Sequence, residues 1–471
     1  MKNLTLIVIF ILLLFACSIG PNYTKPKLNM PTGWQENQAT IESKKEIDKQ
    51  WWKNFQDVSL NNLVDKALSN NLDIKIAATR IQQARAERSG VIANQLPDVN
   101  LSGSATRGKN SKNSYPPDFN GRIYNTFQTG FDASWELNIF GAKRAIEAAN
   151  ASLEATEELA HDTTVSLLGD VASNYIAIRN YQDQIIVAEE NLTAQRDTLE
   201  LIKSQKDAGL MSEIDVMRAA ALVNSTESDI PILKASMKES LHSLEILLAE
   251  QPGTLDSLLS EKAKVPVSEK ELVLGAPADI IRNRPDIREA ERNLAAATAT
   301  KGVIIAEMFP KISLASFFGL ASSSTSNLLQ FPSKAWNTGA NGVLPILDFG
   351  RLRADINIAS SLQEQAFLTY QKTVLNGLKE VENGLVAYYE EKKRMESLRK
   401  TAKEQKLATK LITERYRTGG LISFLDVLDA EKSLYSAEIA LAQSKASLST
   451  DLVVLYKALG GGWQETTIQI K

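Results

Sequence analysis

The chain has 471 residues, more than twice what one ordinary core needs, so its length predicts two or three domains or one very elongated architecture. It is 44% apolar and 23% charged, which excludes a disordered chain and a polytopic helical membrane protein. The 53 basic and 56 acidic residues nearly balance, so nucleic acid is not an expected partner. One Cys and two His exclude an intrachain disulfide and disfavour a structural zinc site.

The N-terminus reads as an export signal. Lys2 precedes an apolar run over residues 6–15, which is shorter than the roughly 20 residues that span a bilayer. We therefore expect residues 1–16 to be a signal peptide. The run Leu14-Phe15-Ala16-Cys17 resembles a bacterial lipobox, which implies acylation of Cys17 and cleavage before it; the alternative is a buried free thiol at the end of a signal anchor. Ser18, rather than Asp, favours export to the outer membrane by the same resemblance.

The rest of the chain is duplicated. Residues 73–253 match residues 286–461 at an offset of about 210, and five of the eight residues in 209–216 are identical to those in 420–427. A period this long indicates a duplicated domain-sized unit. After a lipidated extension over residues 17–60, we expect a first repeat at 61–270 and a second at 271–471, each with a helix, two strands and long helices. The pair Trp51-Trp52 in the extension is predicted to pack against the helices rather than to anchor in lipid.

Each repeat contains a very long helical pattern. Residues 141–208 and 350–418 contain no proline, and about 70 helical residues would extend roughly 100 Å. Apolar or small residues recur at alternating steps of three and four, which predicts coiled-coil packing, with an ordinary helical bundle as the alternative. These seam positions are Ile185, Ala188, Leu192, Gln195, Leu199 and Ile202, and Tyr435, Ile439, Ala442, Ala446, Ser449, Val453 and Tyr456. Pro231 should kink or interrupt the helix that follows the first long one.

Each repeat also contains two segments with a period of two. Apolar and polar residues alternate over residues 99–105 and 127–139, and again over 312–316 and 336–344. Such alternation suits a transmembrane β-barrel with one face on lipid and the other on water. Four strands cannot close a barrel around a channel and open edges are not tolerated in lipid, so spanning strands would require an oligomer. The alternative is a pair of soluble hairpins packed on the helices.

Several short motifs, taken together, resemble one known family. The chain resembles the TolC-like outer membrane factors, in their NodT-type lipoprotein branch, over essentially its whole mature length. The resemblance is carried by Cys17 through Tyr23, Trp51 through Phe55, Ile230-Pro231, Pro252-Gly253, Arg284 through Arg288, Tyr416 through Gly419, and Leu428 through Ala430. It implies a mainly α fold with a transmembrane β part: a long antiparallel α-helical coiled-coil barrel, with four strands per chain forming a 12-stranded β-barrel in a trimer.

The resemblance also implies a function. Such proteins are exit ducts of tripartite efflux systems, in which an inner-membrane transporter supplies energy and a periplasmic adaptor protein joins the two. We therefore expect a lipid-anchored, passive channel in the outer membrane that extends into the periplasm. It would be neither an enzyme nor a cofactor-binding protein. The alternatives are a non-conducting periplasmic scaffolding lipoprotein and a type I secretion duct with protein cargo.

The sites of interest in a duct are its constrictions, which the resemblance places at the turns between the long helix pairs. Asp426 and Asp429 share a helix face after the second turn and would form carboxylate rings in a trimer. Asp215 and Arg218 take the matching positions in the first repeat, so a base such as Arg218 could pair with Asp426 or Asp429 and hold the aperture shut. Leu425 would narrow it. An Asp near a helix start also complements the helix dipole, which is the simpler interpretation.

Overall fold

The computed structural model describes residues 19–35, 40–41, 48–113, 121–268, 270, 273–419 and 422–465. The expected signal peptide and Cys17 lie outside these residues. The first half contains a 3₁₀ helix η1 (Trp51–Phe55), helices α2 (Val58–Asn70) and α3 (Leu72–Ala93), strands β2 (Asp98–Lys109) and β3 (Ile123–Leu137), and helices α4 (Ala142–Asp207) and α5 (Glu213–Leu247).

The second half follows the same order. It contains α6 (Pro277–Asn283), α7 (Pro285–Ala306), β5 (Lys311–Ser322), a 3₁₀ turn η3 (Phe331–Ser333), β6 (Lys334–Val343), α8 (Arg351–Arg417), α9 (Phe424–Ala458) and η4 (Trp463–Glu465). The short strands β1 (Thr40–Ile41) and β4 (Val273–Leu274) form a parallel pair. Among the described residues, no helix combines the length and the apolar character needed to cross a membrane.

The described chain forms two compact units, each with segments from both halves of the sequence. Unit 1 comprises the described parts of Met1–Lys27, Ile81–Thr156 and Glu289–Tyr370, and unit 2 those of Leu28–Arg80, Glu157–Arg288 and Gln371–Lys471. The four predicted strands all belong to unit 1. The turns that join the long helices belong to unit 2.

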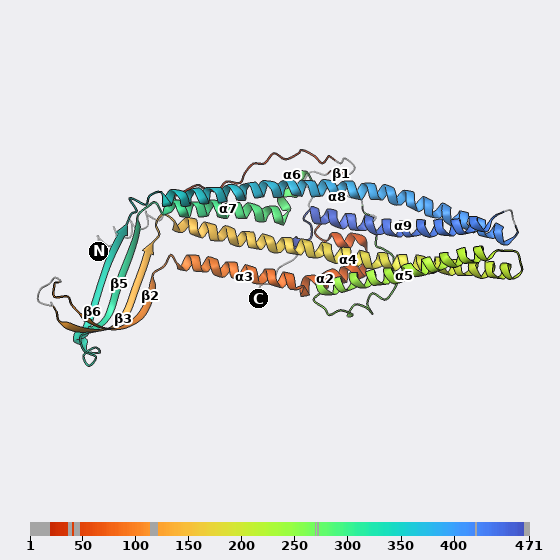
Figure 1. Cartoon of the computed structure of the whole chain (residues 1–471). Coiled ribbons are helices and arrows are strands. Elements are labelled where there is room, and N and C mark those ends of the chain that lie inside the picture. The colour runs from red at the N-terminus through yellow and green to blue at the C-terminus, as the bar shows by residue number, and fades with distance from the viewer. Residues whose placement is uncertain are drawn as a thin grey trace. The chain divides into compact units, whose positions relative to one another are not determined.

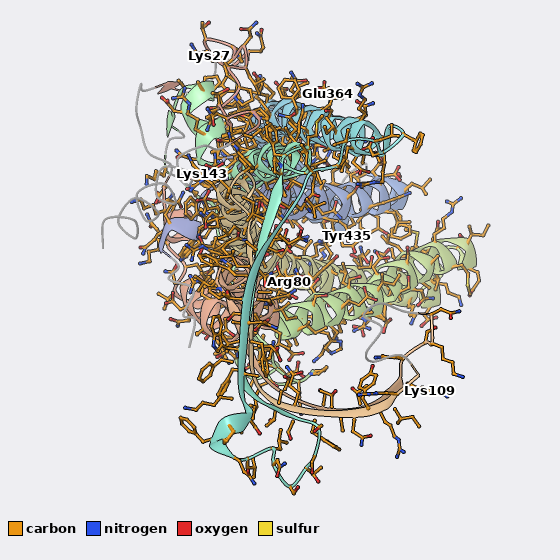
Figure 2. The ribbon with its side chains drawn as sticks, turned by 90° about the vertical axis from the view of Figure 1, so that its left-hand side faces the viewer. Lys27, Arg80, Lys109, Lys143, Glu364 and Tyr435 are labelled. Atoms are coloured by element: carbon orange, nitrogen blue, oxygen red, sulfur yellow. The ribbon has the colours of Figure 1, made fainter. Side chains whose placement is uncertain are left out.

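The two hairpins of unit 1 form one antiparallel sheet, with the strand order β2-β3-β5-β6 (Figure 1). The alternation predicted from the sequence is confirmed, because the register places an apolar residue from each strand in one row: Leu101, Phe131, Phe318 and Trp336. All four are exposed. Side chains project from both faces of the strand ribbons in Figure 2, and nearly every residue of β2 and β6 is exposed. Soluble hairpins packed on helices would bury one face, so this arrangement favours spanning strands.

Two glycines set the spacing at the centre of the sheet. Gly130 of β3 lies opposite Gly319 of β5, and a Cβ on either would lie 2.6 Å from the Cα of the other. The Phe317 ring occupies the space beside them, on the face opposite the apolar row, and is buried. On that same face the Ser102 hydroxyl donates a hydrogen bond to Asp132. The two faces of the sheet therefore differ in polarity, as a boundary between lipid and water requires.

In both turns from strand to long helix, a polar side chain accepts a bond from the backbone N–H of a glycine. Asn138 accepts a hydrogen bond from the Gly141 N–H at 2.9 Å, and Asp348 accepts one from the Gly350 N–H at 3.0 Å. The first bond joins residues three apart and the second joins residues two apart, and the second turn includes Phe349 and Gly350 at φ 54° and 93°, so the two turns differ in geometry.

The long helices α4 and α8 confirm the predicted spans. They run for 66 and 67 residues, and no proline removes a backbone donor from either. Pro231 lies within α5, which is continuous from Glu213 to Leu247. The interruption expected at this proline is therefore absent. The seam positions predicted on α4 and α9 are buried or partly buried, and several are Ala or Ser, which lets the helix backbones approach closely.

The hydrophobic core of unit 2 includes the 3₁₀ helix η1 of the N-terminal extension. Trp51 and Trp52 are buried, and the Trp51 ring stacks on Tyr456 of α9 with centroids 5.3 Å apart. Leu60, Leu63 and Val64 of α2 complete this contact with α4 and α9. The prediction that the tryptophan pair packs against helices is confirmed. Trp51, Trp52 and Phe55 of the extension are thus part of the folded core.

Candidate functional site

Two glycine-containing turns end the long helices at the same end of unit 2 (Figure 1). Gly209 follows α4 with φ +77° and Gly419 follows α8 with φ +76°, a left-handed conformation that favours glycine. After α4, the Gly209 and Leu210 N–H groups donate to the carbonyls of Lys206 and Gln205 at 2.8 and 2.9 Å. This pattern satisfies helix-end carbonyls within the backbone and reverses the chain tightly. Residues 420–421 of the second turn lie outside the described part.

The helices that leave these turns both begin with a capping box. The Ser212 hydroxyl donates to Asp215 Oδ2 at 2.6 Å, and the Asp215 N–H donates to Ser212 Oγ at 3.3 Å. At α9, the Ser423 hydroxyl and N–H donate to Asp426 Oδ2 at 2.8 and 2.9 Å. A serine at the N-cap and an acid three residues later satisfy two helix-end N–H groups reciprocally. Asp215 and Asp426 therefore stabilise the starts of α5 and α9, whether or not they also act at an aperture.

These capping bonds also fix the charge of both carboxylates. The Ser423 hydroxyl, and then its backbone N–H, lowers the pKa of Asp426 below its ordinary value of 3.8. The Ser212 hydroxyl and N–H, followed by the charge of Arg218, lower the pKa of Asp215 in the same way. A lowered pKa in the folded state means that the bonds stabilise the helix starts above pH 3.8. That contribution is lost as the pH falls through the lowered pKa.

Asp429 and Arg218 lie one helical turn beyond the capping acids. Both are exposed, and Asp429 shares its helix face with Asp426 as the sequence predicted. Within the described part of the single chain, no ion pair joins Arg218 to Asp426 or Asp429. The pairing of Arg218 with Asp426 or Asp429 that the sequence suggested is thus not found within the described residues of one chain, and it stays a prediction.

A small apolar cluster holds the four helix ends together, and we call it the tip core. It consists of Ile202, Val216, Ala219, Phe424 and Val427, with Tyr416 packed against it. Leu425, between Phe424 and the capping acid, is 48% exposed instead. It is thus available to face a second copy or a channel, while its neighbours fix the direction of α9.

Two polar contacts of this tip were not identified from the sequence. The Tyr416 hydroxyl on α8 donates to Gln205 Oε1 on α4 at 2.6 Å, and Lys206 forms an ion pair with Glu213 across the first turn. Burial, and then the negative charge of Asp215, raises the pKa of Tyr416, so the phenol stays a donor. Tyr416 belongs to the motif Tyr416 through Gly419, which contributed to the family resemblance. Membership of this motif was the sequence feature that could have indicated a role for Tyr416. Its partner Gln205 lies 211 residues away, and no local pattern marks the pair.

A buried carboxylate lies further along α9. Glu431 is 5% exposed, and its Oε1 accepts a hydrogen bond from the Thr198 hydroxyl of α4 at 2.6 Å. Burial raises the pKa of Glu431, although the Thr198 bond and the positive charge of Arg417 on α8 oppose the shift. Polar residues thus link α4 and α9 behind the tip core.

Comparisons with known proteins agree with this architecture. The model of the family described as outer membrane efflux protein matches residues 63–250 and 276–461, one stretch in each half of the chain. The chain belongs to the outer membrane efflux protein family. Nodulation protein T of Rhizobium leguminosarum bv. trifolii is 34% identical over 96% of this chain and 96% of its own length. The toluene efflux pump outer membrane protein TtgI of Pseudomonas putida is 33% identical over 98% of this chain and 99% of its own length.

A solved structure shares the fold of this efflux protein. The outer-membrane channel OprN superposes with a TM-score of 0.89 at 33% identity, covering 95% of this chain and 100% of that one. The resemblance inferred from the motifs is therefore confirmed, and so is the predicted fold class. Cys17 lies outside the described residues, so its acylation stays a prediction.

The second capping box gives a direct test of what holds the tip. Ser423→Ala removes the N-cap hydroxyl of α9 and is expected to lower local stability by about 1 kcal/mol. Hydrogen exchange should accelerate at the first amides of α9, residues 424–427. Ser433→Ala, an exposed serine in the interior of the same helix, is the matched control and should leave these rates unchanged. Equal rates in both variants would contradict the capping role.

Proposed function

We propose that this protein is the exit duct of a tripartite efflux system, a passive channel in the outer membrane that carries substrates out of the periplasm. The observation that supports this most directly is the four-stranded sheet of unit 1, with an exposed apolar row on one face and hydrogen-bonding groups on the other. The family is named for outer membrane efflux, and TtgI is named as the outer membrane protein of a toluene efflux pump. Conduction through such a duct needs no catalytic residue, and we expect no enzymatic activity.

The working form proposed here is a homotrimer. Within the described part of the chain, β2 and β6 each pair on one side only, so each leaves a row of backbone N–H and C=O groups without a strand partner. Such groups cost several kcal/mol each in hydrocarbon, and a closed barrel is the arrangement of strands that avoids this. Three copies would bring twelve strands together, which agrees with the 12-stranded barrel inferred from the resemblance. A periplasmic adaptor protein and an inner-membrane transporter are the proposed partners.

The duct hypothesis predicts a measurable channel. The full-length protein, purified from outer membranes, should migrate as a heat-modifiable trimer and open single channels in a planar bilayer. Protein denatured by heat is the control for conductance caused by contaminating detergent. A stable trimer that binds partners but never conducts would support the scaffolding alternative instead. Export of a protein reporter would identify the type I secretion alternative, which shares this fold and differs in cargo.

The N-terminal cysteine is proposed to carry the lipid anchor. Each buried CH₂ of an acyl chain contributes about 0.8 kcal/mol, so a multiply acylated residue would hold the protein firmly in the inner leaflet of the outer membrane. Mass spectrometry of the N-terminal peptide should show Cys17 as the first residue with added acyl mass. Cys17→Ala should remove that mass. A peptide that begins upstream of Cys17, or carries no acyl group, would exclude lipidation.

The exposed acids at the tip are proposed to form the periplasmic aperture. In a trimer, Asp426 and Asp429 would repeat three times around the axis, and their negative field would favour cations. Leu425 would line the same constriction, while Asp215 and Arg218 would supply the facing charges. The lowered pKa of Asp426 supports this, because the carboxylate stays charged at neutral pH.

Replacing both acids tests the aperture. Asp426→Ala with Asp429→Ala should raise conductance and reduce cation selectivity, since the carboxylates no longer repel anions or bind counter-charges at the constriction. Glu239→Ala with Glu404→Ala removes the same charge from exposed positions of α5 and α8 outside the tip and serves as the control. Conductance and selectivity that match the unmodified protein would rule out the aperture role.

A further inference from the structure

The segment that follows the expected lipidation site is held by a buried arginine. Arg144, in the first turn of α4, is 3% exposed although it carries a full charge. Its Nε donates to the Ile19 carbonyl at 3.0 Å, and its Nη2 donates to the Gly20 carbonyl at 3.0 Å and to Asn22 Oδ1 at 2.7 Å. Nη1 donates to Glu147 Oε2 at 2.7 Å. The planar guanidinium thus directs donors to two consecutive backbone carbonyls, a geometry that a lysine could not reproduce.

Two glycines allow the segment to lie this close. Gly20 has φ +92°, and a Cβ there would lie 2.6 Å from the Cα of Gly302 on α7. A Cβ on Gly302 would in turn lie 2.9 Å from Cγ and Cδ of Arg144. Both the conformation and the space at residue 20 therefore exclude a side chain. The backbone of residues 19–20 therefore lies against Arg144 of α4 and Gly302 of α7.

A second set of contacts attaches the next residues. The Tyr23 hydroxyl donates to Glu291 Oε1 of α7 at 2.9 Å, and Lys25 forms an ion pair with the same carboxylate. Arg292 lies over the Tyr23 ring, 5.4 Å from its centroid, and reaches Glu154 of α4 at 3.0 Å. Burial opposes ionisation of Glu291, but the bonds from Lys25, Arg292 and Tyr23 outweigh it and lower its pKa. Residues 19–25, which we call the strap, therefore connect α4 to α7.

Both helices that contact the strap lead directly to or from the strands of unit 1. Arg144 lies seven residues after the end of β3, and α7 ends five residues before β5 begins, so both helices carry the strap next to the strands. We propose that Arg144, Gly20 and Gly302 form an intramolecular docking site for the mature N-terminus, which holds the strap at the junction of helices and strands without help from an acyl chain. A lipid on Cys17, two residues upstream, would then be held within about 7 Å of the Ile19 backbone. The membrane anchor would then have a fixed position relative to the sheet, instead of being attached through a flexible segment.

The docking site can be tested in protein that is never acylated. A cleavable signal peptide without a lipobox, combined with Cys17→Ala, removes the lipid and the only native thiol. Ile19→Cys, at a half-buried position, then accepts a nitroxide label in the full-length assembled protein. Electron paramagnetic resonance should show an immobile label in this parent. Arg144→Ala and Gly20→Ala should each raise the mobile fraction several-fold, because the first removes the donors and the second introduces the excluded Cβ.

Lys143→Ala is the matched control. Lys143, labelled in Figure 2, precedes Arg144 on α4, is 60% exposed, and approaches Glu147 only at 3.9 Å. Its loss should leave the label immobile. A mobile label in the parent would overturn the proposal, because the acyl chain would then be what holds the segment. A label that stays immobile in folded Arg144→Ala or in Gly20→Ala would overturn it as well. Gly20 lies outside every helix and strand, so this variant keeps the test decisive if Arg144→Ala does not fold.

Discussion

The unpaired edges of the sheet are the constraint on which the rest of the structure depends. β2 and β6 offer backbone donors and acceptors that have no strand partner within the described chain, and the apolar row beside them favours a hydrocarbon environment. Each neighbouring pair in the order β2-β3-β5-β6 is antiparallel, so β6 runs opposite to β2. A rotated copy therefore presents its β2 to this β6 in the antiparallel direction. The pairing that continues the sheet from copy to copy has the same geometry as the pairing within one chain.

The duplication of the chain also gives the two long helices nearly equal lengths. α4 and α8 differ in length by one residue, and one residue changes a helix by about 1.5 Å. Each starts after a strand-to-helix turn in which a side chain, Asn138 or Asp348, accepts a bond from a backbone N–H. Near the ends of these helices, the Tyr416 hydroxyl of α8 bonds to Gln205 of α4, and the tip core takes residues from both halves. The two halves of the chain are therefore matched in the length of their long helices as well as in the order of their elements.

The sequence predicted the elements whose pattern is periodic along the chain. The alternation around Phe131 and Trp336 identified strands, and the proline-free stretches identified α4 and α8. Contacts between distant residues left no such pattern: neither the Tyr416 bond to Gln205 nor the Arg144 bond to the Ile19 carbonyl follows from spacing. The capping role of Asp426 was visible in principle, since Ser423 stands three residues before it. The spacing of Asp426 and Asp429 indicated a pair of charges on one helix face instead.

The two acids of α9 differ in how many carboxylate oxygens are already hydrogen-bonded within the chain. Asp426 Oδ2 accepts both bonds from Ser423, so one of its oxygens is committed to the helix start. Asp429 forms no side-chain hydrogen bond or ion pair with the described residues of its own chain, which leaves both of its oxygens for another copy or a cation. A bidentate partner such as a guanidinium needs two oxygens of one carboxylate. In the proposed trimer, Asp429 would therefore be the better ligand for a charge from a neighbouring copy, while Asp426 caps the start of the helix that carries it.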